Sequence, residues 1–264
     1  MHLEAWHPGL ASDDLCSQRP AHAAVDARIE SGRVQIDGTL FDDQRAAGEL
    51  QASFAAPVDE WAVEPPDAMP PVDLTLAIDG ADLSNVPVVC QELEGQVFLE
   101  LAAEDVFGDA PVATLAARFA NLRSGDNAPA NLELGARIDR NDVRAEIVLD
   151  DETREHFRAS GHAPVRFDEE LRLPLPVYEE WTGQARFDEA PLALLAAPVS
   201  LVGSPSGTLD GRVRASGDEE GIHVRGAISF NEVSFTLREP LVRVTDMTGT
   251  LRLDDDKLHL HDLR

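Results

Sequence analysis

Apolar and polar residues alternate along most of this chain. Val34, Ile36 and Leu40 recur at even spacings in one run, and Leu50 and Phe54 do the same in the next. Side chains of a β-strand point in turn to the two faces of a sheet, so this period of two indicates strands with one apolar and one polar face. The pattern predicts an all-β protein, a long curved antiparallel sheet of roughly a dozen or more strands built from amphipathic hairpins.

The apolar positions of these runs are expected to share one face of the sheet, from the first hairpin to the last strand. They are Val34, Ile36, Leu40, Leu50, Phe54, Leu74, Leu76, Ile78, Val97, Leu99, Leu132, Leu134, Ile138, Val143, Ile147, Leu149, Leu209, Val213, Ile222, Val224, Ile228, Phe230, Val233, Phe235, Leu237, Val242, Val244, Leu251, Leu253, Leu258 and Leu260.

One hairpin is written twice in the sequence. Ala27–Ile29 stands 109 residues before Ala136–Ile138, whereas ASFAAPV at 52–58 stands 107 residues before ASGHAPV at 159–165. In each copy an acidic stretch interrupts the alternation between these matches. We interpret the pair as a repeated hairpin with a slip of two residues inside the turn region.

Turns and helices are marked more sparsely. Gly and Asp tolerate the backbone angles of tight turns, which we expect at 217–221 and 254–257. A short helix is predicted at Pro191–Ala197, because Pro suits a first helical position and Pro198 would stop the helix. A second, weaker helical candidate is Glu104–Arg118, and the proline-rich segment Glu64–Val72 is expected to be a stiff joint.

These signals divide the chain into four segments. They are 1–66, a hairpin repeat; 67–130, middle strands after the proline-rich joint; 131–180, the second copy of the hairpin; and 181–264, the short helix with the C-terminal strands.

Composition narrows the possible partners. The chain has 264 residues and a formal net charge of −27, from 49 acidic against 22 basic residues. Such a charge repels phosphate backbones and anionic head groups, so nucleic acid is not an expected partner. Cys16 and Cys90 lack the spacing of a metal or redox motif, and whether they form a disulfide stays open. The longest apolar stretch, 190–203, is too short and too rich in proline to span a bilayer.

The motifs that carry catalysis are not expected here. Gly203–Gly207 has Pro205 where a nucleophile elbow needs Ser, so we interpret it as a turn. His259 and His261 would share a polar face without a third ligand nearby, and Asp254–Asp256 lacks the ligand ladder of a calcium loop. We therefore expect no enzyme, no metal and no cofactor.

The apolar face of so long a sheet needs a partner. Contiguous exposed apolar surface beyond a few hundred Å² usually marks an interaction site. The sheet can pack as a sandwich, close as a barrel, or curl over a ligand. The face is mostly aliphatic, which suits either an aliphatic core or a groove for an apolar ligand.

The C-terminal third resembles the TamB family of translocation and assembly module subunits, within the wider AsmA-like group. The resemblance rests on PLALL at 191–195, GTLDGRVRASG at 207–217, VRGAISF at 224–230 and VTDMTGTLRLDDDKL at 244–258. These match a repeated family phrase of a short helix, a G-x-L-x-G strand, a second strand and a turn. The likeness is good over 181–264, fair over 21–61 and 132–180, and slight elsewhere.

The resemblance implies a taco-shaped β trough that crosses the periplasm of a diderm bacterium, anchored in the inner membrane by an N-terminal helix. Its apolar lining would conduct phospholipid acyl chains to the outer membrane, and the family is tied to outer-membrane protein assembly. The implied partners are phospholipids and, through other parts of a full-length protein, a BamA-like outer-membrane barrel. This chain has no membrane helix, so we expect a fragment of a longer protein.

Two hypotheses of function follow from the sequence. The first is a lipid-conducting segment of a TamB-like or other AsmA-like envelope protein. The alternative is a non-enzymatic structural or adhesive β-repeat module whose apolar faces pack on each other in a closed core. They differ in whether the apolar face is open.

Overall fold

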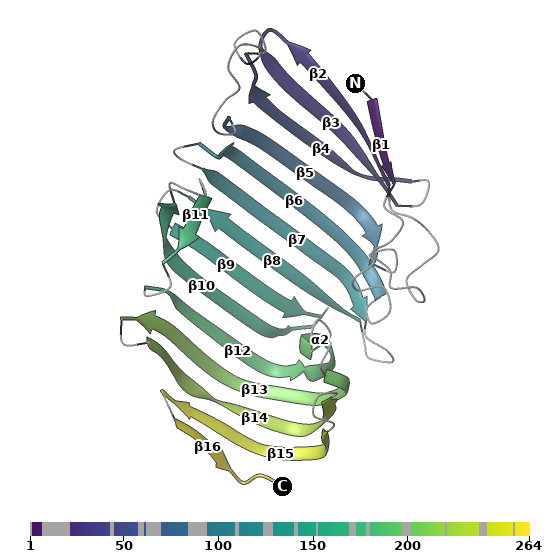
Figure 1. The fold of residues 1–264 in the computed structure, drawn as a ribbon. Helices are drawn as coiled ribbons and strands as arrows, with labels where there is room; N and C mark the ends of the chain where they lie inside the picture. Colours follow the sequence, from purple (N-terminus) through teal and green to yellow (C-terminus); the bar gives the residue numbers. More distant parts are fainter. Residues whose placement is uncertain are drawn as a thin grey trace.

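The chain forms one long, curved antiparallel sheet that does not close (Figure 1). The computed structural model describes residues 2–6, 22–42, 45–57, 61, 70–83, 94–108, 111–123, 129–139, 142–151, 153–168, 173–177, 180–196, 202–219, 221–237, 242–255 and 257–264. The strands are β1 (His2–Trp6), β2 (His22–Glu30), β3 (Arg33–Asp42), β4 (Arg45–Ala55), β5 (Val72–Asp82), β6 (Glu94–Val106), β7 (Val112–Arg123), β8 (Ala130–Ile138), β9 (Asp142–Asp150), β10 (Glu155–Asp168), β11 (Leu173–Pro176), β12 (Thr182–Pro191), β13 (Val202–Asp218), β14 (Gly221–Leu237), β15 (Val242–Asp254) and β16 (Lys257–His261).

Strand order in space follows strand order in the chain. Each strand from β1 to β10 pairs with the next, β10 then pairs with β12, and the order continues to β16; β11 pairs only with β10. Figure 1 shows the result as a twisted ladder, from the purple N-terminal strands to the yellow C-terminal ones. The predicted fold class is confirmed, since short connections between amphipathic strands favour hairpin pairing of chain neighbours.

One predicted helix is present and the other is wrong. Helix α2 (Leu192–Ala196) lies within the predicted segment 191–197 and buries Ala193 and Leu194. The candidate at Glu104–Arg118 instead contains the end of β6 and the start of β7. Pro111 directly precedes β7, and its apolar residues then recur every second position and pair on both sides, which outweighs the helix propensity of the alanines.

Several predicted turns and joints can now be placed. Hairpin turns at 217–221 and 254–257 are confirmed by the closing pairs Asp218↔Gly221 and Asp254↔Lys257. The interpretation of Gly203–Gly207 as a turn is wrong, because this segment is part of β13, where the register with β14 shifts. Most of the proline-rich joint, both cysteines and Asp256 lie outside the described residues.

The repeated hairpin is present, but the predicted slip of two residues in its turn is wrong. In the first copy Leu40 pairs with Gly48 and Ile36 with Ala52; 109 residues later, Leu149 pairs with Phe157 and Ala145 with Gly161. Both copies also carry one extra residue at the same place, Ala47 and His156. The two hairpins therefore match at one constant offset, and the ASFAAPV and ASGHAPV segments are shifted by two residues within the strand, which keeps the same face.

The turn of the second copy is organised by Asp151. One of its carboxylate oxygens accepts hydrogen bonds from the hydroxyl and the amide of Thr153, at 2.5 and 2.7 Å, and from the amide of Arg154 at 3.0 Å. The other lies 2.7 Å from Nε2 of the buried His156, whose Nδ1 lies 3.2 Å from the Asp188 carbonyl oxygen. Hydrogen bonds from Thr153 and then from His156 hold the pKa of Asp151 well below its ordinary value.

This geometry predicts an acid-sensitive contribution to stability. Because the pKa of Asp151 is lower in the folded than in the unfolded chain, the carboxylate stabilises the fold above about pH 4, and that contribution is lost as pH falls through the folded-state pKa. Asp151→Asn should lower Tm at pH 7, and the difference from wild type should shrink below about pH 4. Thermal melts over this pH range measure it, with Glu133→Gln as the control. A Tm deficit that does not vary with pH would contradict the assignment.

Strands β13 and β14 approach most closely at two glycines of the family-like motifs. Gly211 and Gly226 have φ of +143° and +153°, values that residues with a side chain rarely adopt. A Cβ atom would lie 2.1 Å from the Ala227 carbonyl oxygen at Gly211, and 2.2 Å from that of Arg212 at Gly226. The backbone of the partner strand occupies the space a side chain would need.

Gly226→Ala should therefore destabilise the protein by at least about 2 kcal/mol, since it combines backbone strain with a clash against backbone. Gly135→Ala is the matched control, because a Cβ there meets nothing within 4 Å, and its effect should stay within about 0.5 kcal/mol. Equilibrium urea denaturation of both variants compares them. Equal stability of the two variants would contradict the close-approach argument.

Candidate functional site

Strand register places every predicted apolar residue on one face of the sheet, here called the apolar face. Directly paired residues of antiparallel strands point to the same side, so rows of side chains can be followed from strand to strand. One such row crosses the sheet from β2 to β16: Ala23, Leu40, Gly48, Ile78, Leu99, Ala117, Leu134, Ile147, Ala159, Ala185, Val213, Gly226, Leu253 and Leu258.

This row contains no polar side chain. At a strand spacing of about 4.8 Å it extends for about 60 Å. Parallel rows on either side bring in the other predicted residues, for example Leu50, Leu76 and Leu101. The alternation in the sequence thus becomes a continuous aliphatic surface, because every strand is paired in phase with the next.

The apolar face is covered unevenly. Leu149 and Val233 are fully buried at 1% exposure, whereas Ile147 is 36% exposed and Ile222 and Leu258 are 69% and 70% exposed. Large aliphatic side chains that remain this accessible show that the described part of the sheet has no second layer over these positions. The face is therefore packed near one margin and open to solvent elsewhere.

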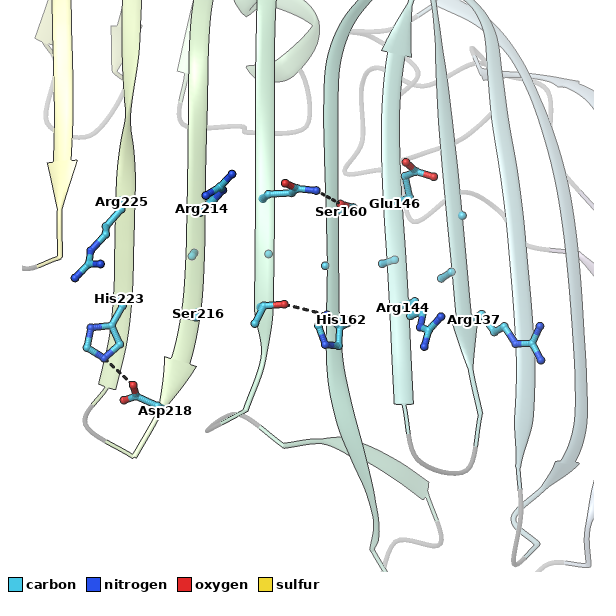
Figure 2. A pocket seen from close by; sticks show the side chains of 18 of the residues that line it. Arg137, Arg144, Glu146, Ser160, His162, Arg214, Ser216, Asp218, His223 and Arg225 are labelled. Carbon is cyan, nitrogen blue, oxygen red and sulfur yellow. Dashed lines mark hydrogen bonds and ion pairs between the residues drawn. The ribbon is translucent and has the colours of Figure 1, made fainter.

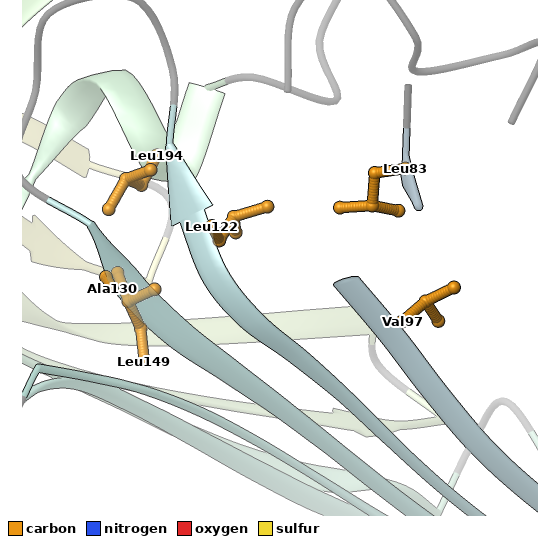
Figure 3. Packing of buried hydrophobic residues seen from close by; sticks show 6 residues of the cluster. All are labelled: Leu83, Val97, Leu122, Ala130, Leu149 and Leu194. Carbon is orange, nitrogen blue, oxygen red and sulfur yellow. The ribbon is translucent and has the colours of Figure 1, made fainter. Parts of the chain in front are cut away.

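Helix α2 provides the packed margin. Its Leu194 belongs to a buried cluster contributed by strand ends that are far apart in the sequence (Figure 3). The cluster consists of Leu83, Val97, Leu122, Ala130, Leu149 and Leu194. A neighbouring cluster around Ala190, Leu209 and Val233 continues the packing through Phe157 and Phe187, whose ring centroids are 5.1 Å apart. A five-residue helix thus holds the curved sheet at one side.

Buried and open positions of the same face should respond differently to truncation. Leu149→Ala removes a fully buried side chain and should destabilise the protein by about 2–5 kcal/mol. Leu260→Ala, at 60% exposure, should cost less than about 0.5 kcal/mol. Urea denaturation distinguishes them, and a loss of similar size at Leu260 would mean that this position is packed in solution.

The opposite surface, here called the polar face, carries groups that reasoning along the sequence did not single out. From β7 to β16 its rows are rich in basic residues, which are Arg118, Arg137, Arg144, Arg158, Arg186, Arg212, Arg214, Arg225, Arg252 and Lys257. Several are in ion pairs, such as Arg158 with Glu155 at 2.7 Å and Arg225 with Asp255 at 2.6 Å. Alternation identified these positions as polar, but their gathering depends on which strands pair.

The candidate ligand groups from the sequence do not assemble into a metal site in the described residues. His259 and His261 lie on the polar side of β16, with ring centroids 6.3 Å apart, and no group of three His, Cys, Asp or Glu side chains among the described residues could hold a metal ion. A search of the same residues finds no helix of the length and apolarity needed to cross a membrane.

The site is thus a sheet with two chemically distinct faces, one aliphatic and one polar with a basic half. No protein-family model, curated protein or solved structure matches this chain.

Proposed function

We propose that this chain is a lipid-conducting segment of a TamB-like or AsmA-like envelope protein, in which the apolar face carries phospholipid acyl chains between the inner and outer membranes. The observation that supports it best is the apolar row from β2 to β16, which no polar residue interrupts. The periplasmic setting, a BamA-like partner and a role in outer-membrane biogenesis and protein assembly come from the sequence resemblance.

An aliphatic row matches the chemistry of an acyl chain. A hydrocarbon tail offers no hydrogen bonds, so a polar group along its path would lose water without gaining a partner. Covering apolar surface is worth about 25 cal/mol per Å², whichever residue provides it. A uniform row of Leu, Ile, Val, Ala and Gly therefore gives similar binding at each step, which favours movement along the sheet over capture at one point.

The open face distinguishes this proposal from the structural or adhesive alternative. That alternative placed the apolar faces against each other in a closed core, whereas the described strands form a single unclosed sheet. Ile147 and Ile222 would have to be covered in such a core, and they are 36% and 69% exposed.

The proposal predicts bound phospholipid that depends on the apolar face. The purified chain should carry phospholipid in native mass spectra, identified after organic extraction. Leu134→Asp with Ile147→Asp places two charges side by side in the apolar row and should abolish the bound lipid, because an acyl chain cannot solvate a carboxylate.

The matched control is Gly135→Asp with Val148→Asp, which adds the same charges on the same two strands but on the polar face. It should retain phospholipid. Circular dichroism confirms that both variants keep their β structure. Absence of lipid from the wild-type chain, or its retention in Leu134→Asp/Ile147→Asp, would refute the proposal.

A further inference from the structure

The polar face is divided by charge. On β2 to β6 its rows carry Asp26, Asp37, Glu49, Asp73 and Glu100. On β8 to β14 the same rows carry arginine and histidine instead, so that Arg137, Arg144 and His162 are direct neighbours across three strands. A chain with a net charge of −27 therefore presents a local concentration of positive groups on half of one face.

These basic groups line a hollow of about 1360 Å³ on the polar face (Figure 2). Its cationic or potentially cationic lining consists of Arg137, Arg144, His162, Arg214, His223 and Arg225. Ser160, Thr182 and Ser216 add hydroxyl groups between them. Figure 2 shows these side chains contributed by successive strands, with only backbone and small residues as the floor.

The acidic groups in the hollow do not neutralise it. Glu146 is paired with Arg158, and Asp218 lies 3.0 Å from Nε2 of His223. Arg144 and Arg225 have their own partners in Asp142, at 2.5 Å, and Asp255.

Arg137 and Arg214 form no ion pair with any described residue, although both line the hollow. They lie on β8 and β13, four strand spacings apart, which corresponds to about 19 Å. A single small anion cannot reach both guanidinium groups, so a ligand that satisfies them is elongated and carries several negative charges.

We propose that this hollow binds a soluble, linear phosphate polyanion that runs across β8 to β14. Guanidinium groups donate in a planar fork that fits phosphate oxygens, and the intervening hydroxyls supply further donors to the remaining oxygens. The ligand is soluble and not a lipid head group of the proposed conduit, because the hollow and the apolar face lie on opposite sides of the sheet.

The net charge of the chain does not prevent such binding. At physiological ionic strength charges more than about 8 Å away are largely screened, so a ligand in the hollow responds mainly to its lining. The same reasoning predicts that binding weakens steeply with added salt, since each phosphate contact releases a counterion.

The test is isothermal titration of the chain with linear inorganic polyphosphate at several salt concentrations. Arg137→Gln with Arg214→Gln should weaken binding at least about tenfold and reduce the salt dependence. Arg212→Gln with Arg252→Gln is the matched control, because it removes the same charge from the same face outside the hollow's lining. Its effect should be less than about twofold, reflecting only the weak screened field.

Each other outcome overturns the proposal. No binding by the wild-type chain refutes it, and equal losses in the two double variants show diffuse attraction to the face. Polyglutamate that binds as tightly as polyphosphate refutes the phosphate class, and binding of anionic phospholipid vesicles with the same dependence on Arg137 and Arg214 identifies a membrane surface instead. Lipid extracted from Arg137→Gln/Arg214→Gln should match wild type, so this test is independent of the proposed lipid function.

Discussion

The in-phase pairing of neighbouring strands is the constraint on which the rest of this structure depends. In a sheet, a shift of one residue in any pair would turn all later apolar side chains to the other face. Here the phase is kept through every pair from β2 to β16, so short amphipathic hairpins add up to one aliphatic face and one polar face. Both proposed binding surfaces follow from this single property.

Bulges would be expected to break the phase, and their geometry shows how it is preserved. At four register shifts the apolar spacing changes from two to three residues, as in Ile78 to Ala81 and Phe119 to Leu122. The residues inside these steps include Gly80 and Asn121, which have φ of +68° and +53°. A left-handed residue in the bulge reorients the strand, so the next apolar side chain returns to its face while the sheet gains curvature.

Curvature and the small helix explain why the sheet needs so little core. The described residues contain only two large side chains that are fully buried, Leu149 and Val233. Extended backbone hydrogen bonding and pairwise contacts within the apolar rows therefore carry much of the fold, as in other proteins built from stacked repeats. Such an architecture can leave one face accessible, which a closed sandwich cannot.

The sequence by itself determined the strands, the two faces and helix α2, because a period of two and a proline-bounded apolar segment are local properties of the chain. Every residue assigned to the apolar face lies there. Only the tertiary structure decided that Glu104–Arg118 forms strands, that the two hairpin copies keep a constant offset of 109 residues, and that the sheet stays open. It also brought Arg137, Arg144 and Arg214 together. Neighbours across a sheet are set by strand pairing and bulges, and these depend on contacts between residues that are distant in the sequence.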